Sequence, residues 1–323
     1  MSRQLKEIAP RPSASTLAPI NRNDYVLVKQ SRELNKILEV TDKNIDVDYI
    51  SGKAKMQNKR GDMIVSVDLN ELQTLQFDAG THLFLLYLLY ELTKAPHDTG
   101  EICVPFKNYM AIRGLKDKKS ALDSACRHMA VLRRTSFERL GEHSYGFVNL
   151  ADSGEVDSKF IKFKPTKTFL DSLNQLNPLP TALGIYSINP HKNPYSVYLL
   201  HKLLESKREN GDRIISVKAL VDGMNNLPSR EDEMLNHRHL TRNIIGPFER
   251  DMDALLWCLK WEYCGEKETP APTDVSTNYD IFINSYIKVY WLDYPDQIQY
   301  LAAKAKHQKK ATKNSKQTTS QNQ

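Results

Sequence analysis

The sequence predicts the same order of elements twice, and this repeat restricts the fold more than any other feature of the chain. The order is an apolar helix, a short extended piece, a short helix, a longer helix and a pair of strands. The first helices share a motif, because Tyr87-Leu-Leu recurs as Tyr198-Leu-Leu, and the longer helices share Arg127-His-Met and Arg250-Asp-Met. This is the order of a winged helix, whose third helix enters the major groove of DNA. We therefore expect an α+β protein with two tandem winged-helix domains.

Local signals place the helices of the first copy. A strongly apolar helix is expected at 79–94, and a short helix begins at Pro105, a residue favoured in the first helical turn. Gly114 ends that helix, and the longer helix follows at 117–134. Alternating residues then predict strands, up to a closing helix near 166–174.

The second copy begins with a helix at 195–209, followed by an extended piece at 214–217 and a short helix at 217–224. Its long helix is expected within 229–265, and a hairpin within 279–291. Pro247 is expected either to bend the long helix by removing one backbone hydrogen bond or to restart it after a break at Gly246.

The long helix of the second copy has two different faces when it is plotted at about 100° per residue. The apolar face consists of Leu240, Ile244, Ile245, Phe248, Met252, Leu255 and Leu256. The polar face consists of His239, Arg242, Asn243, Gly246 and Arg250. Arginine reads guanine or grips phosphate, and asparagine reads adenine, so this face is suited to nucleic acid. A solvated helix surface is the alternative interpretation.

The long helix of the first copy has the same division. Its apolar stripe consists of Ala121, Leu122, Ala125, Met129 and Leu132. The other side is a basic polar face that consists of Ser120, Ser124, Arg127 and Arg134, with Lys116, Lys118 and Lys119 at the helix start. The lysines are better suited to phosphates than to bases. Lys288, near Tyr286, is a further candidate on a predicted wing.

The remaining segments complete a predicted domain organisation. Within the first domain a strand is expected at 24–29, a helix at 31–39, a hairpin tip or loop at 41–62 and a strand at 63–69. The predicted parts are a disordered arm at 1–23, a first winged-helix domain at 24–176, a linker with four prolines at 177–194, a second winged-helix domain at 195–296 and a lysine-rich tail at 297–323.

The net charge of +6 comes from the tail. After Asp296 the chain has six lysines and no acidic residue, and the rest of the chain has 39 basic and 39 acidic residues. Any polyanion site in the folded part must therefore come from local clustering of charge. The tail itself is either a sequence-independent phosphate binder or a solubilising end.

Several classes of function lack their sequence signals. No apolar run is long enough for a membrane span, and the N-terminus lacks the apolar core of a signal peptide, so a cytoplasmic protein is expected. The four cysteines are widely spaced, so neither a disulfide framework nor a zinc ribbon is indicated, and Cys258 is expected to be a buried thiol. No P-loop occurs, and no metal or other cofactor is expected.

His237-Arg238-His239 has the spacing of a rolling-circle nickase motif, but with arginine between the histidines. On a helix two side chains at this spacing diverge and do not readily share a metal ion. A metal-dependent nickase therefore stays a minor alternative, and we expect no enzymatic activity.

Three fragments resemble replication initiator proteins of iteron-bearing, theta-replicating plasmids, which consist of two winged-helix domains. Tyr25-Val-Leu-Val-Lys-Gln-Ser-Arg-Glu-Leu is similar to the N-terminal stretch of that family, and Arg242–Leu255 is similar to its second recognition helix. Ile188–Tyr195 resembles the domain junction. The similarity covers about residues 24–295. The chain departs from the family in the polar insert 41–62 and in Arg32, where the family usually has asparagine.

The resemblance implies a mechanism. Both recognition helices would bind one origin repeat of double-stranded DNA in successive major grooves, and bound monomers would help to melt an adjacent AT-rich segment and recruit a host helicase or initiator. Dimers would form through the N-terminal domain and repress the initiator's own promoter. The first helix would act through Ser120, Ser124, Arg127 and Arg134, and the second through His239, Arg242, Asn243 and Arg250. A winged-helix transcriptional repressor or copy-control protein is the alternative function.

Overall fold

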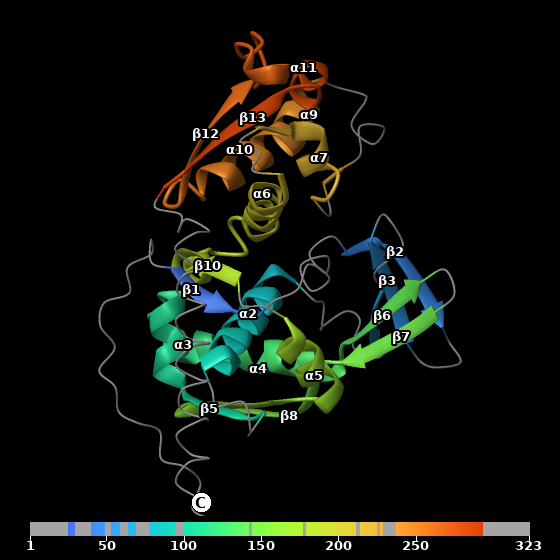
Figure 1. The fold of residues 1–323 in the computed structure, drawn as a ribbon, viewed down its shortest axis with the longest axis vertical. Helices are drawn as coiled ribbons and strands as arrows, with labels where there is room; N and C mark the ends of the chain where they lie inside the picture. The colour runs from blue at the N-terminus through green and yellow to red at the C-terminus, as the bar shows by residue number, and fades with distance from the viewer. Residues whose placement is uncertain are drawn as a thin grey trace, which may run out of the picture.

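The protein is a mixed α+β chain, seen here in a computed structural model (Figure 1). The structure describes residues 25–29, 40–48, 53–58, 64–68, 78–94, 100–141, 144–176, 179–210, 214–224, 227–228 and 237–292. The predicted arm 1–23, the predicted helix 31–39 and the lysine-rich tail 297–323 lie outside the described residues.

The described part of the chain contains the predicted order of elements twice. In the first unit the elements are α2 (Ala79–Lys94), β5 (Ile102–Pro105), α3 (Phe106–Arg113), α4 (Lys118–Arg134), β8 (Ala151–Val156) and β9 (Phe160–Pro165), followed by α5 (Lys167–Gln175). The three strands form an antiparallel sheet in the order β5-β9-β8.

The second unit has the same order and the same strand arrangement. Its elements are α6 (Ser196–Asn210), β11 (Ile214–Ser216), α7 (Val217–Val221), the long helix formed by α9 (His237–Leu240), η4 (Thr241–Ile245) and α10 (Gly246–Asp253), then β12 (Leu259–Cys264), η5 (Glu266–Glu268), α11 (Tyr279–Ile283) and β13 (Tyr286–Trp291). The sheet order is β11-β13-β12, so in both units the last strand lies between the other two.

Local capping fixes the helices of the first unit where the sequence predicts. Gly114 ends α3 in the left-handed region, with φ of 64°, a conformation that glycine adopts without strain. Asp117 caps α4, because its carboxylate accepts a hydrogen bond from the Lys119 amide at 3.0 Å. Thr166 caps α5 in the same way, through the Phe169 amide.

Helix α2 is the centre of the first unit. Every residue from Leu83 to Leu89 is at most 1% exposed, because the helix is apolar on all sides. It packs against α4 and β5 and against the strand β1 (Tyr25–Val28). Gly80 permits the close approach to α4, since an added Cβ would lie 2.9 Å from Cε1 of His128.

A second sheet is inserted between α4 and β8. Strands β6 (Ser136–Gly141) and β7 (Ser144–Asn149) extend the antiparallel strands β2 (Val40–Asp48), β3 (Lys53–Asn58) and β4 (Ile64–Asp68) into a five-stranded sheet in the order β2-β3-β4-β6-β7. Figure 1 shows this sheet to one side of the helices. The polar segment 41–62 therefore contains a strand pair, and β6 and β7 are not the hairpin that follows the third helix in the repeated order. That hairpin is β8–β9.

The proline-containing segment 177–194, predicted to be a linker, is folded where the structure describes it. Strand β10 (Leu179–Ala182) pairs with β1, and the 3₁₀ helix η3 (Leu183–Ser187) follows. Tyr186 is fully buried and donates to the carbonyl of Leu86 in α2 at 3.2 Å. Arg113 of α3 donates to the Tyr186 carbonyl at 2.6 Å. The segment is thus attached to the first unit rather than being a free spacer.

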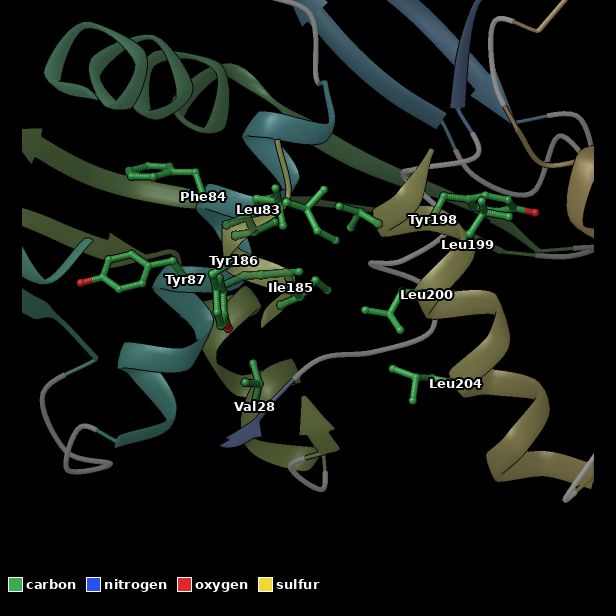
Figure 2. Close-up of a cluster of buried hydrophobic side chains, with 14 of the residues drawn as sticks. Val28, Leu83, Phe84, Tyr87, Ile185, Tyr186, Tyr198, Leu199, Leu200 and Leu204 are labelled. Carbon is green, nitrogen blue, oxygen red and sulfur yellow. The ribbon is translucent and has the colours of Figure 1, made fainter. Parts of the chain in front are cut away.

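The two units share one hydrophobic core. Figure 2 shows Leu200 and Leu204 of α6 pointing toward the cluster that contains Val28 and Ile185. His82 of α2 and His201 of α6 meet edge to face, with ring centroids 5.5 Å apart. In Figure 1, α6 lies between the rest of the second unit and the first unit.

Two predictions in the second unit are wrong. The long helix ends at Asp253, and 259–264 is strand β12 rather than helix, because this segment pairs along its whole length with β13. Residues 279–283 form α11 rather than a strand, since Asn278 caps a helical turn by accepting from the amides of Asp280 and Ile281.

Within the described part of the chain, no helix has the length and apolar character needed to cross a membrane. All four cysteines are free thiols, and Cys258 is buried, as predicted.

Candidate nucleic-acid interface

The start of α4 gathers the predicted lysines. Lys116, Lys118 and Lys119 are all exposed, around the N-terminal turn of the helix. Ser120 is exposed as well, but its hydroxyl donates to the Asp117 carboxylate at 2.6 Å. That bond, with the one from the Lys119 amide, lowers the pKa of Asp117. The serine has one hydroxyl proton, and this proton is used on the N-cap Asp117. Ser120 can therefore donate to a phosphate only if that bond opens.

Ser124, the next predicted residue, is also engaged within the protein. It is half-buried, and its hydroxyl lies 3.0 Å from Nε2 of His128. The other ring nitrogen of His128 lies 2.9 Å from Oγ1 of Thr81 in α2, and that hydroxyl donates to the Asp78 carboxylate at 2.9 Å. Because the Thr81 proton is used on Asp78, Thr81 accepts from Nδ1–H, and Ser124 donates to Nε2.

This chain of bonds requires a neutral His128. The imidazole is 3% exposed, and burial lowers its pKa to about 4, against the opposing charge of Asp78. The Asp78 carboxylate also accepts from the Thr81 amide at 2.7 Å, so it caps the first turn of α2. Helix α4 is therefore joined to the N-terminus of α2 by polar contacts as well as by apolar packing.

Arg127 and Arg134 occupy different settings. The Arg127 side chain is 45% exposed, with Nη2 3.8 Å from the Asp78 carboxylate. Arg134 is half-buried at the end of α4 and makes a polar interaction of its own. Between them Val131, which falls on the same helical face at about 100° per residue, is 1% exposed. The polar face is thus exposed at Ser120 and Arg127, half-buried at Ser124 and Arg134, and interrupted by the buried Val131.

The long helix of the second unit separates its faces much as predicted. His239, Arg242, Gly246 and Arg250 are exposed, and Asn243 is half-buried. The apolar stripe is buried from Leu240 to Leu255. Leu256 is the exception, since it is 49% exposed, because the helix has ended at Asp253 and the helical periodicity no longer applies.

Pro247 is accommodated without a break in the helix. Ile245 and Gly246 have helical backbone angles, and the segment η4 before the proline is π-helical. The Gly246 amide donates to the Thr241 carbonyl, five residues earlier. A proline lacks the amide proton for the next bond of an α-helical ladder, and one wider turn absorbs this defect. The predicted restart at Gly246 is therefore wrong.

Arg250 is fixed by its neighbour in the sequence. Its Nε donates to Oδ1 of Asp251 at 2.8 Å, and the Asp251 side chain is fully buried while that of Arg250 is 49% exposed. Oδ2 of Asp251 accepts from the Tyr195 amide at 2.5 Å, and Ser196 donates to the Asp251 carbonyl at 2.9 Å. Burial raises the pKa of Asp251, and the bonds from Tyr195 and Arg250 oppose that shift.

The hairpins that follow the long helices have paired charges. In the first unit Lys162 lies 2.9 Å from Glu155, and Lys164 lies 2.9 Å from Asp152. In the second unit Lys288 donates to Glu268 at 2.6 Å and is 20% exposed. The predicted phosphate contact of Lys288 would therefore require this ion pair to open, unlike the contacts expected of Lys118 and Lys119.

Asp78, His128 and Asp251 are the site residues that sequence reasoning missed. A signal existed for Asp78, because an aspartate three residues before Thr81 at the start of an apolar helix is typical of an N-cap. The alignment of Arg127-His-Met with Arg250-Asp-Met also placed a polar residue between arginine and a core methionine in both copies. Neither signal indicates which partner the polar residue contacts.

The described residues contain no group of three or more His, Cys, Asp or Glu side chains that could hold a metal ion. His239 is exposed on α9, and the side chain of His237 lies outside the described residues.

No protein-family model matches the sequence, and no curated protein matches it significantly. Among solved structures, a selenomethionine crystal structure of domains 2 and 3 of RctB has a TM-score of 0.39 and 12% identity, covering 76% of this chain and 90% of that one. A second crystal structure of RctB domains 2–3 has a TM-score of 0.37 and 12% identity, covering 80% and 97%. Neither match establishes a family for the chain.

Proposed function

We propose that this chain is a sequence-specific double-stranded DNA-binding protein that initiates replication of a plasmid-type replicon by binding origin repeats and promoting their opening. In this proposal the two units are winged helices. The protein is cytoplasmic, and it has no enzymatic activity. Self-association and recruitment of a host helicase or initiator belong to the same proposal and derive from the resemblance to iteron-binding initiators.

One observation carries the DNA-binding part. In each unit the third helix of the repeated order leaves a polar face with exposed arginine uncovered, while its other face is buried in the core. The third helix of a winged helix is the one that enters the major groove. Guanidinium groups on such a face are suited to guanine edges and to phosphates.

The proposal assigns base reading and phosphate binding to different groups. Arg127 in the first unit and Arg242, Asn243 and Arg250 in the second are the candidates for base contacts. Lys116, Lys118 and Lys119 surround the N-terminus of α4, where the helix dipole adds to their charge, and are the candidates for phosphates. Because residues 1–296 carry equal numbers of basic and acidic residues, their non-specific affinity should be modest and its salt dependence should come from this local cluster.

The test of this proposal is binding selection from random duplex DNA at about 150 mM salt, where the pull of exposed charges beyond about 8 Å is screened. A single enriched motif that spans two successive major grooves is the expected result. A palindrome would instead indicate a dimeric repressor that uses one unit per half-site. No enrichment would mean that the polar faces are only solvated surface.

The initiator role needs a second measurement. A supercoiled plasmid that carries several copies of the selected motif beside an AT-rich segment is probed for unpaired thymines with and without the protein. Opening of the AT-rich segment supports an initiator, and binding without opening supports the repressor. A covalent protein–DNA adduct formed with Mn²⁺ or Mg²⁺ would contradict the assignment as a protein without enzymatic activity.

A further inference from the structure

In both units the exposed arginine of the long helix lies beside a carboxylate that also caps the first helix of the same unit. Arg127 and Arg250 occupy matching positions in the two copies, and each precedes a buried polar residue and a buried methionine. The carboxylates differ in origin. Asp78 precedes α2, whereas Asp251 belongs to the long helix itself.

The second unit shows the arrangement at its tightest. The Asp251 side chain is fully buried and uses both oxygens, one for the Tyr195 amide before α6 and one for Nε of Arg250. Asn193 adds a contact of 3.5 Å from its side-chain amide to the Arg250 carbonyl. The bond to Asp251 uses Nε, so Nη1 and Nη2 at the far edge of the guanidinium are the donors left for a ligand.

The first unit has a looser contact between the corresponding arginine and another acid. Oδ1 of Asp78 accepts from the amide and hydroxyl of Thr81, and Oδ2 faces Nη2 of Arg127 at 3.8 Å. Both side chains are about half exposed, so this pair contributes little to stability. Both units thus place an acid near the start of the first helix and beside the arginine, although the two acids come from different elements.

We propose that Asp251 and Asp78 are positioning residues that orient Arg250 and Arg127 toward DNA, and so set the sequence discrimination of each long helix. The inference rests on the proposed function. An arginine side chain has many rotamers, and ordering it on binding lowers affinity. A carboxylate that already holds one side of the guanidinium removes part of that ordering and leaves a defined edge for a base.

The positioning role and the negative charge of the two aspartates predict opposite effects on DNA binding when the charge is removed. An acid near DNA repels phosphate, so Asp251→Asn and Asp78→Asn raise affinity for unrelated duplexes. The same substitutions lower discrimination between the selected motif and a variant with one changed base pair, by roughly tenfold, because the loss of one good arginine contact corresponds to about 5- to 150-fold. Tyr195 and Thr81 still have an oxygen acceptor in either variant.

The experiment measures that ratio of affinities for the full chain, with unfolding midpoints recorded for every variant. Arg250→Ala, Asp251→Asn and their combination form one cycle, and Arg127→Ala, Asp78→Asn and their combination form the other. Asp253→Asn and Asp123→Asn are matched controls, because each removes one exposed negative charge from the same long helix. If Asp251 acts through Arg250, Asp251→Asn adds no loss of discrimination once Arg250 is alanine.

The outcomes separate the inference from the function on which it rests. If the wild-type chain selects no motif, both are overturned. If Arg250→Ala or Arg127→Ala loses discrimination while the aspartate variants keep it, DNA reading stands and the positioning role is rejected. Equal losses in the control variants would also reject it, because charge alone would then explain the effect. If Asp251→Asn fails to fold, the cycle of Arg127→Ala and Asp78→Asn tests the positioning role, because Asp78 is half exposed.

Discussion

Gly246 lies on the exposed face of the second long helix with ordinary helical angles, φ −58° and ψ −47°. An added Cβ would meet only the Thr241 carbonyl, at 3.5 Å, which is an ordinary contact. Glycine within a helix costs about 0.5–1 kcal/mol relative to alanine, so Gly246→Ala should raise the free energy of unfolding by about that amount. If DNA approaches this face closely, the same variant should bind the selected duplex more weakly. Urea denaturation and a binding titration check both, and unchanged binding would remove Gly246 from the interface.

His128 makes the stability of the protein depend on pH. Its pKa is lowered from 6.5 to about 4, chiefly by burial, and the surrounding charges are those of Asp78, Arg127, Arg113 and His191. A lowered folded-state pKa means that the full contribution is present above pH 6.5 and is lost as the pH falls through about 4. The total amounts to about 3 kcal/mol.

The check is urea denaturation at several pH values between 4.5 and 6.5. His128→Gln should reduce the slope of unfolding free energy against pH by about 1.4 kcal/mol per unit, the value for one proton. It should not abolish the slope, because His82 has a pKa lowered by burial to about 3 and contributes with the same sign. His239→Gln, at an exposed position, is the control. An unchanged slope in His128→Gln would show that this imidazole is not kept neutral by the fold.

For single residues, the sequence predicts which side of a helix a residue occupies but not what the residue contacts. A helical wheel placed Ser124 and Arg127 on the polar side of α4, and both lie there. Ser124 and His128 lie four residues apart on α4, so the wheel allows their bond. It could not show that Thr81 bonds to the same imidazole or that Asp78 reaches Arg127, because those partners depend on how α2 crosses α4. The periodicity describes one helix, whereas these two contacts join residues of different elements.

Among the elements, those with their own start and stop signals were predictable. Asp117 and Gly114 fix the ends of helices through bonds within a few residues, so α3 and α4 appear where the sequence places them. The 259–264 segment was not predictable in this way, because its apolar residues continue the helical stripe before it and only pairing with β13 makes it a strand. The insertion of β6 and β7 into a separate sheet is likewise a choice of distant partners.

The charges of the elements predict different roles for helix and hairpin in binding phosphate. Lys118→Ala should reduce the slope of log affinity against log salt by about 1, the signature of one lost phosphate contact. Lys288→Ala should leave the slope unchanged, because this ammonium stays with Glu268, whose bond to it is 2.6 Å. Fluorescence anisotropy at several salt concentrations measures both variants. An equal decrease in Lys288→Ala would place the hairpin of the second unit on the DNA backbone.

At the scale of the whole molecule, the connecting segment joins the two units instead of letting them move independently. In this segment, 177–194, Tyr186 is attached to the first unit by its bonds with Arg113 and Leu86, and Asn193 donates to the Arg250 carbonyl in the long helix of the second. Gly184 lies directly against the ring of Trp257, where a Cβ would not fit. A fixed spacing of two long helices is what reading two successive grooves requires, since a mobile spacer would raise the entropic cost of binding both.

The shared core predicts that the two units unfold together. All three tryptophans, Trp257, Trp261 and Trp291, lie in the second unit, so their fluorescence follows that unit and the contact of Trp257 with Gly184, whereas circular dichroism follows the whole chain. Leu83→Ala removes a fully buried side chain of α2 in the first unit and should lower the free energy of unfolding by about 2–5 kcal/mol. If the units are coupled, the tryptophan and circular dichroism midpoints shift by the same amount. Leu256→Ala, at a 49% exposed position, should shift neither. An unchanged tryptophan midpoint, together with an earlier circular dichroism transition for the first unit, would show that the units fold separately. The spacing of the two long helices would then be set by DNA rather than by the protein.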